Sequence, residues 1–257
     1  MLISPESPEI YGSLKMKHGM IIDLETTGLN SSSEVIAEIG LLEFACSDTF
    51  ENPSITRMHS GLQDPKRPLT PEIIAITGLT DELLKGRSID WKLINHMLSN
   101  ADFYIAHNMQ FDRGFLQESG EVDPQVFQKP WACSQRHIDW STHSPGKSFA
   151  LNYLAADHGF VNPFAHRALF DCATTYRLVQ SHLAELFHRS QQKEFLVAAT
   201  FAPFEKKDLL KERKYRWDGA KKVWSKVLIE SDLPVEREFL AKEVYQGDSK
   251  HSEVAIS

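Results

Sequence analysis

Four carboxylates and one histidine, gathered in three short runs, are the residues of this chain best suited to chemistry. The first run, Ile-Ile-Asp-Leu-Glu-Thr-Thr-Gly, holds Asp23 and Glu25. The second, His-Asn-Met-Gln-Phe-Asp, ends at Asp112, and the third, His-Arg-Ala-Leu-Phe-Asp, runs from His166 to Asp171. Oxygen ligands suit Mg²⁺ or Mn²⁺ rather than Zn²⁺, and two such ions about 3.5–4 Å apart can stabilise both the attacking and the leaving oxygen of an in-line displacement. The runs therefore predict a site for two-metal phosphodiester hydrolysis with a histidine base.

The spacing of Asp23 and Glu25 puts both side chains on one side of a strand, because residues i and i+2 of a strand face the same way. Unpaired, the two carboxylates would repel each other and titrate together, a conflict that divalent cations resolve. We expect Asp112 and Asp171 to complete the ligand set from helices. An isolated Asp-x-Glu is most often a solvated strand end, so it is the joint pattern that favours a metal site.

The residues next to these carboxylates predict how the site is completed. Thr26-Thr27-Gly28 indicates a tight turn whose amides could approach the backbone of a substrate. His166 is expected at or just before the start of a helix, where an imidazole that titrates near neutral pH could deprotonate water. Asn108 is either the N-cap of the helix that carries Asp112 or a support for the site.

The remaining histidines are interpreted differently. His107 precedes Asn108 at a strand-to-helix junction and is expected to support the site rather than perform chemistry. The other nine are interpreted as structural or merely exposed: His18, His59, His96, His137, His143, His158, His182, His188 and His251.

The elements that must position these residues follow from hydrophobic patterns and cap residues. Strands are predicted at residues 20–24, 35–44, 56–62, 103–106 and 131–133. Helices are predicted from Pro71 with Thr70 as N-cap, and over 88–98, 108–118, 148–159 and 167–187. Strands first, followed by strands alternating with helices, predict an α/β fold with a mixed sheet flanked by helices.

Charge divides the chain into two parts. The whole chain of 257 residues carries a net charge of −7, whereas residues 205–226 hold nine Lys or Arg against four Asp or Glu. This shift predicts a boundary near residues 190–200. Together with the predicted elements, it leads us to expect an N-terminal extension (1–17), a catalytic domain (18–189), a linker (190–203), a small basic and aromatic α+β module (204–246) and a frayed tail (247–257). Within the module, we expect a helix over 206–213 and a hairpin around Asp218-Gly219.

Composition excludes several classes of protein. No stretch approaches the ~20 apolar residues of a membrane span, and the polar N-terminus shows no signal peptide. Three widely spaced cysteines without a Cys-x-x-Cys indicate the reducing cytoplasm and no zinc site. The acidic balance argues against a protein that coats nucleic acid by bulk electrostatics, but not against an enzyme that holds a strand end.

The three runs closely resemble the motifs of the DEDDh exonucleases, the DnaQ-like 3′→5′ exonuclease superfamily with its ribonuclease-H-like fold. The resemblance covers about residues 18–188 and includes Ile-Thr-Gly-Leu-Thr at 76–80 and Phe-Ala-Leu-Asn-Tyr-Leu at 149–154. It implies that the four carboxylates bind two Mg²⁺ or Mn²⁺ ions and that His166 is the general base. It also implies that Thr77 and Gly78 lie against the terminal nucleotide.

The implied reaction is hydrolysis of the terminal phosphodiester of DNA, with release of nucleoside 5′-monophosphates. Leu29 and Phe115 are candidates for packing against terminal bases, while the alternative for Phe115 is core packing with Phe111. The substrate is a nucleic acid with a free 3′ end, and DNA repair is the expected setting. An exoribonuclease, a polymerase proofreading subunit with a polymerase or repair-protein partner, and a catalytically silent binding module are the alternatives.

The basic module resembles the C-terminal module of bacterial exonuclease X-type enzymes. Aromatic residues interleaved with cations favour a nucleic-acid backbone and its bases. The alternative is a hairpin whose tryptophans pack on Phe201, Phe204 and Leu210. The candidate nucleic-acid contacts are Arg213, Lys214, Arg216, Trp217, Lys221, Lys222 and Trp224.

Overall fold

The chain folds into two compact units that meet in sequence between Phe187 and His188. The structure, a computed structural model, describes residues 15–146 and 148–256. Most of the N-terminal extension predicted for residues 1–17 lies outside the described residues, and β1 already begins at Met16. None of the helices in the described ranges is long and apolar enough to cross a membrane.

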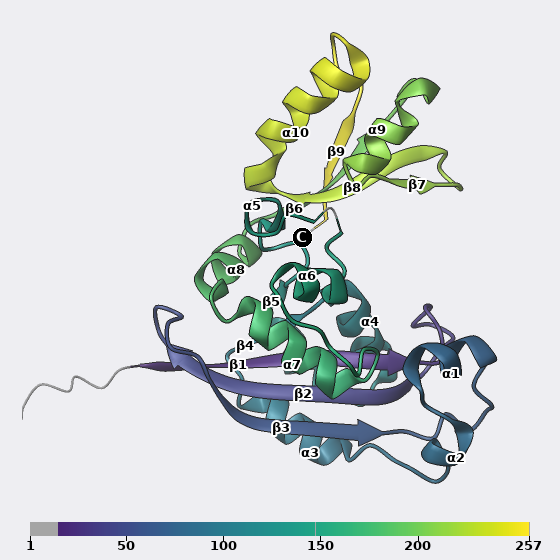
Figure 1. Cartoon of the computed structure of the whole chain (residues 1–257), viewed down its shortest axis with the longest axis vertical. Helices are drawn as coiled ribbons and strands as arrows, with labels where there is room; N and C mark the ends of the chain where they lie inside the picture. The colour runs from purple at the N-terminus through teal and green to yellow at the C-terminus, as the bar shows by residue number, and fades with distance from the viewer. Residues whose placement is uncertain (1–14, 147, 257) are drawn as a thin grey trace, which may run out of the picture. The chain divides into compact units, whose positions relative to one another are not determined.

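The first unit is built on a mixed five-stranded sheet in the order β3-β2-β1-β4-β5 (Figure 1). β1, β2 and β3 form an antiparallel meander, while β4 pairs parallel to β1 and β5 parallel to β4. The strands are β1 (Met16–Thr26), β2 (Ile36–Ser47), β3 (Ser54–Leu62), β4 (Phe103–Ala106) and β5 (Trp131–Cys133). This confirms the predicted α/β, ribonuclease-H-like fold class.

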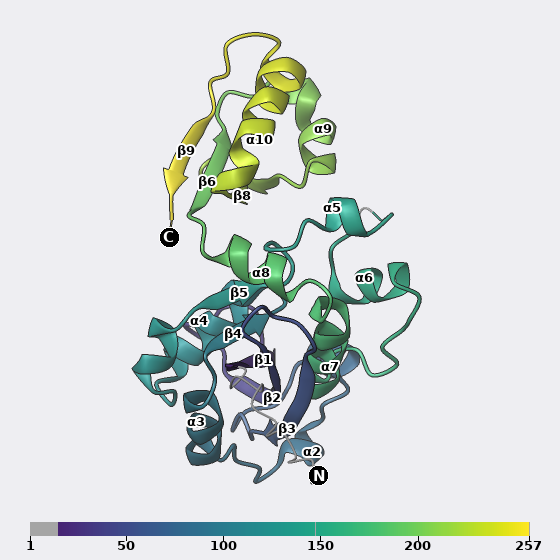
Figure 2. The same cartoon turned by 90° about the vertical axis from the view of Figure 1, so that its left-hand side faces the viewer.

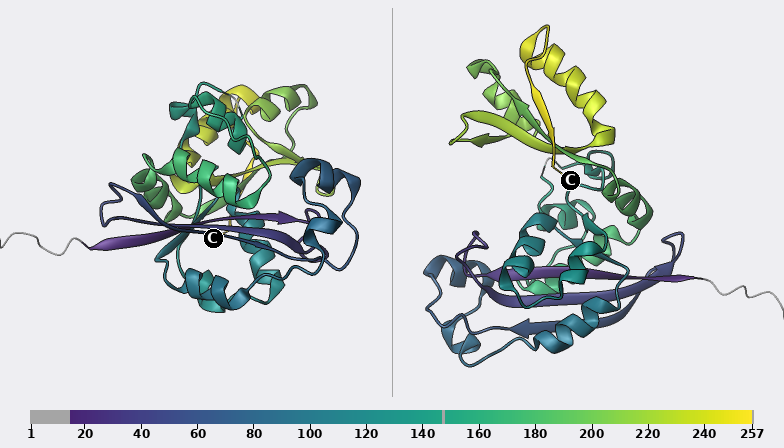
Figure 3. Two further views of the ribbon diagram at one scale, coloured as in Figure 1. Left: turned by 60° about the horizontal axis from the view of Figure 1, so that its bottom comes forward. Right: turned by 180° about the vertical axis from the view of Figure 1, so that it is seen from behind.

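Helices cover both faces of this sheet (Figure 3). The helices of the first unit are α1 (Pro71–Thr77), α2 (Asp81–Leu84), α3 (Trp91–Ser99), α4 (Met109–Ser119), the 3₁₀ helix η1 (Pro124–Gln128), α5 (Trp140–His143), α6 (Leu151–Asp157), α7 (Ala168–Val179) and α8 (Leu183–Ser190). In sequence, α8 continues past the boundary between the units. The Thr70 hydroxyl caps α1 by accepting a hydrogen bond from the Ile73 amide, as its sequence predicts.

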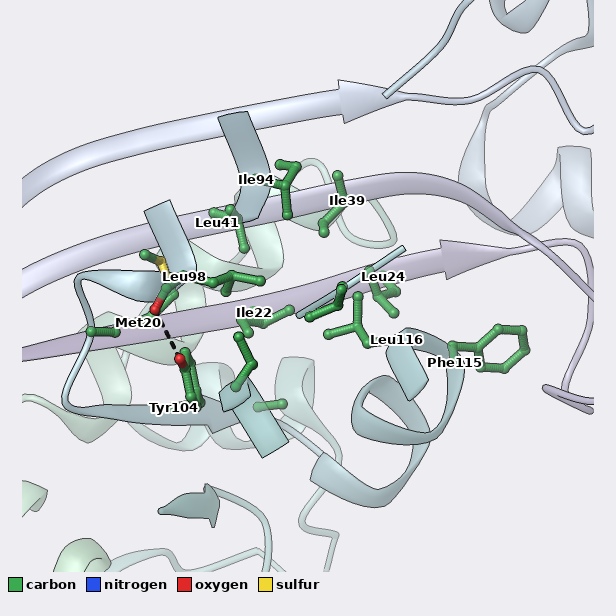
Figure 4. Close-up of a cluster of buried hydrophobic side chains, with 14 of the residues drawn as sticks. Met20, Ile22, Leu24, Ile39, Leu41, Ile94, Leu98, Tyr104, Phe115 and Leu116 are labelled. Carbon is green, nitrogen blue, oxygen red and sulfur yellow. Dashed lines mark hydrogen bonds between the residues drawn. The ribbon is translucent and has the colours of Figure 1, made fainter. Parts of the chain in front are cut away.

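Successive side chains of β1 point to opposite faces of the sheet and contribute to two separate hydrophobic cores. Met20, Ile22 and Leu24 point to one face, where they meet residues of α3 and α4 (Figure 4). Ile21 points to the other face, toward residues of α6 and α7. Asp23 and Glu25 share the parity of Ile21, so the sheet directs both carboxylates to the α7 side.

The second unit has its own four-stranded sheet, in the order β7-β8-β6-β9, against which helices α9 and α10 lie (Figure 2). Its strands are β6 (Glu194–Ala199), β7 (Arg216–Asp218), β8 (Val223–Ile229) and β9 (Ser252–Ala255). Its helices are η2 (Phe204–Lys206), α9 (Lys207–Glu212), η3 (Glu230–Asp232), α10 (Leu233–Phe239) and the π-helical η4 (Leu240–Tyr245).

Three expectations from the sequence are wrong. Residues 190–203 are not a linker throughout, because they contain β6, which pairs with both β8 and β9. Residues 247–257 are not a frayed tail, because β9 extends the sheet through β6. The long helix over 167–187 is two helices, α7 and α8, separated by a turn at residues 180–182.

The hairpin of the second unit also differs from the expected tight Asp-Gly turn. Its loop spans residues 219–222, and Lys222 adopts a left-handed conformation with φ of 51°. The Asp218 carboxylate organises the loop by accepting hydrogen bonds from the amides of Ala220 and Lys221.

Gly40 allows α7 to lie directly on the sheet. A Cβ at this position would be 2.4 Å from the carbonyl carbon of Ala168, the first residue of α7. Cys172, one turn further along α7, donates its thiol to the carbonyls of Gly40 (3.3 Å) and Ile21 (3.6 Å). Backbone-to-helix contact this close is possible only where the strand residue has no side chain.

We predict that Gly40→Ala moves α7 away from β2 and destabilises the first unit. Overpacking against fixed backbone costs about 1–3 kcal/mol, which denaturant unfolding of the full chain would measure. Gly114→Ala in α4 is the matched control, because its Cβ would meet only the Ser31 hydroxyl at 3.9 Å. Alanine inside a helix should be neutral or stabilising by about 0.5–1 kcal/mol. Equal stability of the two variants would contradict this account of Gly40.

Candidate active site

The first run places two carboxylates at the end of a buried strand. Asp23 pairs with Gly40 across β1 and β2, and Glu25 pairs with Glu38 one step further along. Asp23 is half-buried and Glu25 is buried. Because Gly40 has no side chain, the space beside Asp23 is filled by the first turn of α7 rather than by β2.

Asp112 and Asp171 reach the same place from two helices. Each is the fourth residue of its helix, α4 or α7, and each is buried. The partial positive charge of a helix N-terminus favours a carboxylate in the first turn. Asp112 also accepts a backbone hydrogen bond from Leu24, between the two carboxylates of β1.

The carboxylate of Asp171 is fixed through both of its oxygens. Oδ1 accepts a hydrogen bond from the side-chain amide of Asn162 at 2.6 Å, and Oδ2 accepts one from the backbone amide of His166 at 3.0 Å. His166 adopts a left-handed conformation with φ of 61°, which is unfavourable for a residue with a Cβ. The hydrogen bond to Asp171 stabilises this conformation and leaves the imidazole exposed.

These groups are close enough to share a cation. Ligand atoms of Glu25, His166 and Asp171 lie within 4.8 Å of one another. The Asp23 carboxylate interacts electrostatically with the same group of residues. Its pKa is raised well above the ordinary value, first by burial and then by the charges of the other three carboxylates and Glu38. The structure thus brings together all five residues of the three sequence runs.

Burial and mutual repulsion destabilise the charged form of these carboxylates, so a bound positive charge would stabilise the site. Burial raises the pKa of Glu25 to about 8, with the charge of Asp171 as the next cause. The pKa of Asp171 rises to about 6, again mainly through burial, and burial also raises that of Asp112. An all-carboxylate cluster that must otherwise hold protons at neutral pH fits divalent cations with oxygen preference.

An ion pair between buried Glu38 and partly exposed Arg167, not anticipated from the sequence, supports the site. Glu38 lies directly opposite Glu25, a like-charged arrangement that destabilises a sheet when it is left alone. Arg167 resolves it by donating to both Glu38 oxygens, at 2.9 and 3.1 Å. The amide of Ala168 and the hydroxyl of Ser60 donate to the same carboxylate. Glu38 therefore anchors the start of α7, immediately after His166.

His107 is placed as expected, beside the site and not in it. Burial lowers its pKa to about 4, so the ring stays neutral. Its nitrogens bond the Ser134 hydroxyl at 2.9 Å and the Phe149 carbonyl at 3.0 Å. Asn108 occupies the N-cap position of α4 with φ of 73°, but its side chain makes no capping hydrogen bond, contrary to the capping prediction.

The candidate substrate contacts separate into exposed and buried residues. Leu29 is 88% exposed, whereas Phe115 is 2% exposed and packs against Phe111 with ring centroids 4.8 Å apart. The prediction that Phe115 packs against bases is therefore wrong, and the alternative of core packing holds (Figure 4). The buried hydroxyl of Thr77 bonds the Ile73 carbonyl and the Leu79 amide, and Gly78 caps α1 in a left-handed conformation.

The threonine hydroxyls of the predicted turn form hydrogen bonds within the protein. Thr26 donates to the Gly28 carbonyl at 2.6 Å, and Thr27 donates to Glu34 at 2.6 Å. Arg67 bonds both Thr27 and Glu34. These contacts shape the loop after β1 and leave only backbone groups of the turn for a substrate.

Glu38, Arg167 and Asn162 are the site residues that the sequence did not reveal. A lone glutamate in the otherwise apolar run Val-Ile-Ala-Glu-Ile-Gly was the available signal for Glu38. The available signal for Arg167 was its position directly after His166, the candidate base. The sequence contains no comparable signal for Asn162, which lies nine positions before Asp171.

Comparisons with known proteins match the first unit. The family model RNase_T, described as "Exonuclease", matches residues 20–179. The chain is 30% identical over 167 residues to Exodeoxyribonuclease 10 of Escherichia coli K12, covering 62% of this chain and 66% of that protein. It is 29% identical over 162 residues to DNA polymerase III PolC-type of Halalkalibacterium halodurans, covering 62% of this chain but only 11% of the polymerase.

Solved structures share the fold. The zinc-bound complex of E. coli ExoI with single-stranded DNA superposes with a TM-score of 0.53 at 16% identity, covering 72% of this chain and 48% of that one. At this identity the likeness concerns the fold alone.

We predict that the metal-free protein loses stability as the pH rises from about 5 to about 8. Folded Glu25 keeps its proton to about pH 8, whereas an ordinary glutamate loses it near 4.5. The folded state therefore binds more protons in this interval, and the free energy of unfolding falls with pH. Thermal unfolding in EDTA should show this decline, and Mg²⁺ should reduce it by supplying the missing charge.

Glu25→Gln provides the matched control for this pH dependence. The neutral amide cannot ionise, so the decline in EDTA should be shallower than in the wild type. Parallel pH curves for the wild type in EDTA and in Mg²⁺ would show that the carboxylates are not a cation site.

Proposed function

Because this chain belongs to the DEDDh branch of the DnaQ-like 3′→5′ exonuclease superfamily, we propose that it shortens DNA from the 3′ end and releases nucleoside 5′-monophosphates. The observation that carries the proposal is the convergence of five groups from β1, α4 and the start of α7. Glu25, His166 and Asp171 have ligand atoms within 4.8 Å, and the charges of Asp112 and Asp171 raise the pKa of Asp23.

The four carboxylates would hold two divalent cations, Mg²⁺ or Mn²⁺. When bound, such ions neutralise charge on the phosphate and lower the pKa of water. Asp23 and Glu25 are fixed by the sheet, and Asp112 and Asp171 by the first turns of two helices. Hydrogen bonds from backbone amides and Asn162 preorient the last two, so the ligand oxygens do not have to be gathered when the substrate arrives.

His166 would act as the general base. Its backbone is held by Asp171 at 3.0 Å, and its exposed ring has a ligand atom within 4.8 Å of the carboxylates. From there the imidazole could take the proton of the attacking water, a contribution of about 10²–10⁴ in rate for a well-placed base. Arg167, bound to Glu38, fixes the chain directly after this residue.

Exposed apolar side chains beside the carboxylates would receive the terminal bases. Leu29 follows the turn after β1, and the rings of Phe164 and Phe170 lie 4.6 Å apart on either side of His166 in sequence. Stacking on such surfaces tolerates any base, as an exonuclease that removes successive nucleotides requires.

The second unit would bind the same nucleic acid. Trp217 and Trp224 face each other across β7 and β8, with ring centroids 5.5 Å apart, and Trp217 is 52% exposed. Arg216, Lys221 and Lys222 are exposed on the same hairpin. The packing alternative is supported for one of its partners, because Trp224 packs against the core cluster that contains buried Leu210, whereas Phe201 and Phe204 are largely exposed.

Arg213 is less suited to a nucleic-acid contact. Its guanidinium pairs with buried Glu236 at 3.2 Å and lies over the Phe239 ring at 4.6 Å. These contacts hold α9 and α10 together, and the hairpin residues carry the proposed surface.

We predict a ladder of products shortened from the 3′ end when the protein and Mg²⁺ are incubated with 5′-labelled DNA. Matched DNA and RNA oligonucleotides, single-stranded and duplex, would identify the preferred sugar and strand state. EDTA and Asp23→Ala should each abolish the ladder. His166→Gln should slow it by about 10²–10⁴, whereas His96→Gln, an exposed histidine of α3, should not.

Each unexpected result in this assay would contradict a different part of the proposal. Equal rates for His166→Gln and His96→Gln would remove the proposed base. Faster digestion of RNA than DNA would replace the proposed substrate. If no oligonucleotide is digested, the proposed exonuclease activity is wrong.

We also predict that Trp217→Ala weakens binding of the full chain to single-stranded DNA in EDTA by about tenfold, because one stacked base contributes about 1–3 kcal/mol. Fluorescence anisotropy would measure the affinity. Phe201→Ala is the control, since Phe201 is an even more exposed aromatic residue of the same unit outside the hairpin. Unchanged affinity for Trp217→Ala would assign the hairpin another role.

A further inference from the structure

Two histidines and a glutamate meet in the first unit in a cluster that the proposed exonuclease reaction does not use. His143 ends α5, His182 lies in the turn before α8, and Glu185 is in the first turn of α8. One ligand atom from each lies within 4.8 Å of the other two. The cysteine spacing predicts no zinc site, and this cluster has no local sequence signal, because His143 is about forty residues from its partners and each histidine alone is ordinary.

The geometry of the cluster centres on one carboxylate oxygen. Glu185 Oε2 is 3.0 Å from His143 Nε2 and 3.8 Å from His182 Nδ1. The two imidazole rings are 4.3 Å apart between centroids. Ligand atoms around a tetrahedral zinc ion, at about 2.0–2.1 Å from the metal, lie about 3.3 Å from one another. Small side-chain rotations would therefore bring the three atoms to ligand distances.

A simple hydrogen bond accounts for only part of this arrangement. The contact of His143 with Glu185 is an ordinary one, but His182 is directed at the same oxygen. Two protonated imidazoles this close would repel each other. A metal ion bound between the two rings would avoid this repulsion, because its imidazole ligands are neutral.

The surroundings orient the three side chains as supports of a metal site do. The second oxygen of Glu185 accepts the backbone amide of Asp139 at 2.8 Å, which leaves Oε2 for the histidines. Trp140 lies edge-on to His182, with ring centroids 5.6 Å apart, and limits the rotation of that ring. Trp140 is itself fixed by its indole N–H, which donates to the Ser134 carbonyl at 2.7 Å.

We propose that His143, His182 and Glu185 bind a zinc-type transition-metal ion that fastens the α5 segment to the first turn of α8. Two imidazoles and one carboxylate form a donor set that suits Zn²⁺, with water as the fourth ligand. The site is separate from the carboxylate cluster and does not depend on the proposed nuclease activity.

The test is a titration of the tag-free full chain with Zn²⁺ in the presence of a large excess of Mg²⁺, which competes for the carboxylate cluster. Calorimetry would count the bound equivalents, and Co²⁺ in place of Zn²⁺ would report nitrogen coordination through its visible spectrum. We expect the wild type to bind one equivalent more than His143→Ala or Glu185→Gln. Zn²⁺ should also raise the thermal midpoint of the wild type but not of these variants.

Two controls make the result decisive. His188→Ala removes an exposed histidine from the same helix and should keep the full stoichiometry. Asp171→Asn alters the carboxylate cluster and should also keep it. His143 is at the surface, so its replacement should fold, which circular dichroism would verify. Retention of the extra equivalent in His143→Ala and Glu185→Gln, its loss in Asp171→Asn, or no Zn²⁺ binding by the wild type would each overturn the proposal.

Discussion

Mutual repulsion among buried carboxylates is the constraint on which the rest of the first unit depends. Asp23 is surrounded by the charges of three other carboxylates and of Glu38, and burial adds to their effect on its pKa. Such a cluster opposes folding until cations or protons neutralise it. The fold responds with fixed backbone donors: Leu24 to Asp112, and the amide of His166 to Asp171. Each donor partly offsets a charge and also fixes the direction of an oxygen.

The same constraint explains why the contact between α7 and the sheet is so close. Asp171 must reach the end of β1 from a helix that lies across β2. Gly40 has no side chain that would separate them, and the Cys172 thiol bonds the buried strand carbonyls of Ile21 and Gly40. Glu38 then secures the first residues of α7 through Arg167 and the Ala168 amide. The charge of this fifth acidic group still raises the pKa of Asp23 and Glu25, but Arg167 offsets part of it and lowers the pKa of Glu25.

The sequence predicted what local pattern and spacing determine. The strands of the meander, the helix carrying Asp112 and the five residues of the cluster all follow from short runs, because each run combines a buried strand or helix start with its polar group. It did not predict β6 as a strand, since the partners of β6 are β8 and β9, which lie about thirty and almost sixty residues further along. Phe115 shows another limit, because a helix face toward the substrate and one toward the core have the same periodicity. Non-local pairs such as Glu38 with Arg167, 129 residues apart, likewise depend on the assembled sheet.

Donor chemistry would allow one unit to hold two kinds of metal ion at two separate sites. The carboxylate cluster offers hard oxygen atoms and only one imidazole, which suits ions that are abundant, weakly held and able to keep several waters for a substrate. The proposed site offers two imidazoles around a single carboxylate oxygen, and nitrogen donors favour zinc-type ions at far lower concentration. Mg²⁺ gains little from the second site, because it dehydrates reluctantly and prefers oxygen ligands. The separation would therefore follow from the side chains themselves: ions that prefer oxygen would meet carboxylates, and zinc-type ions would meet histidines.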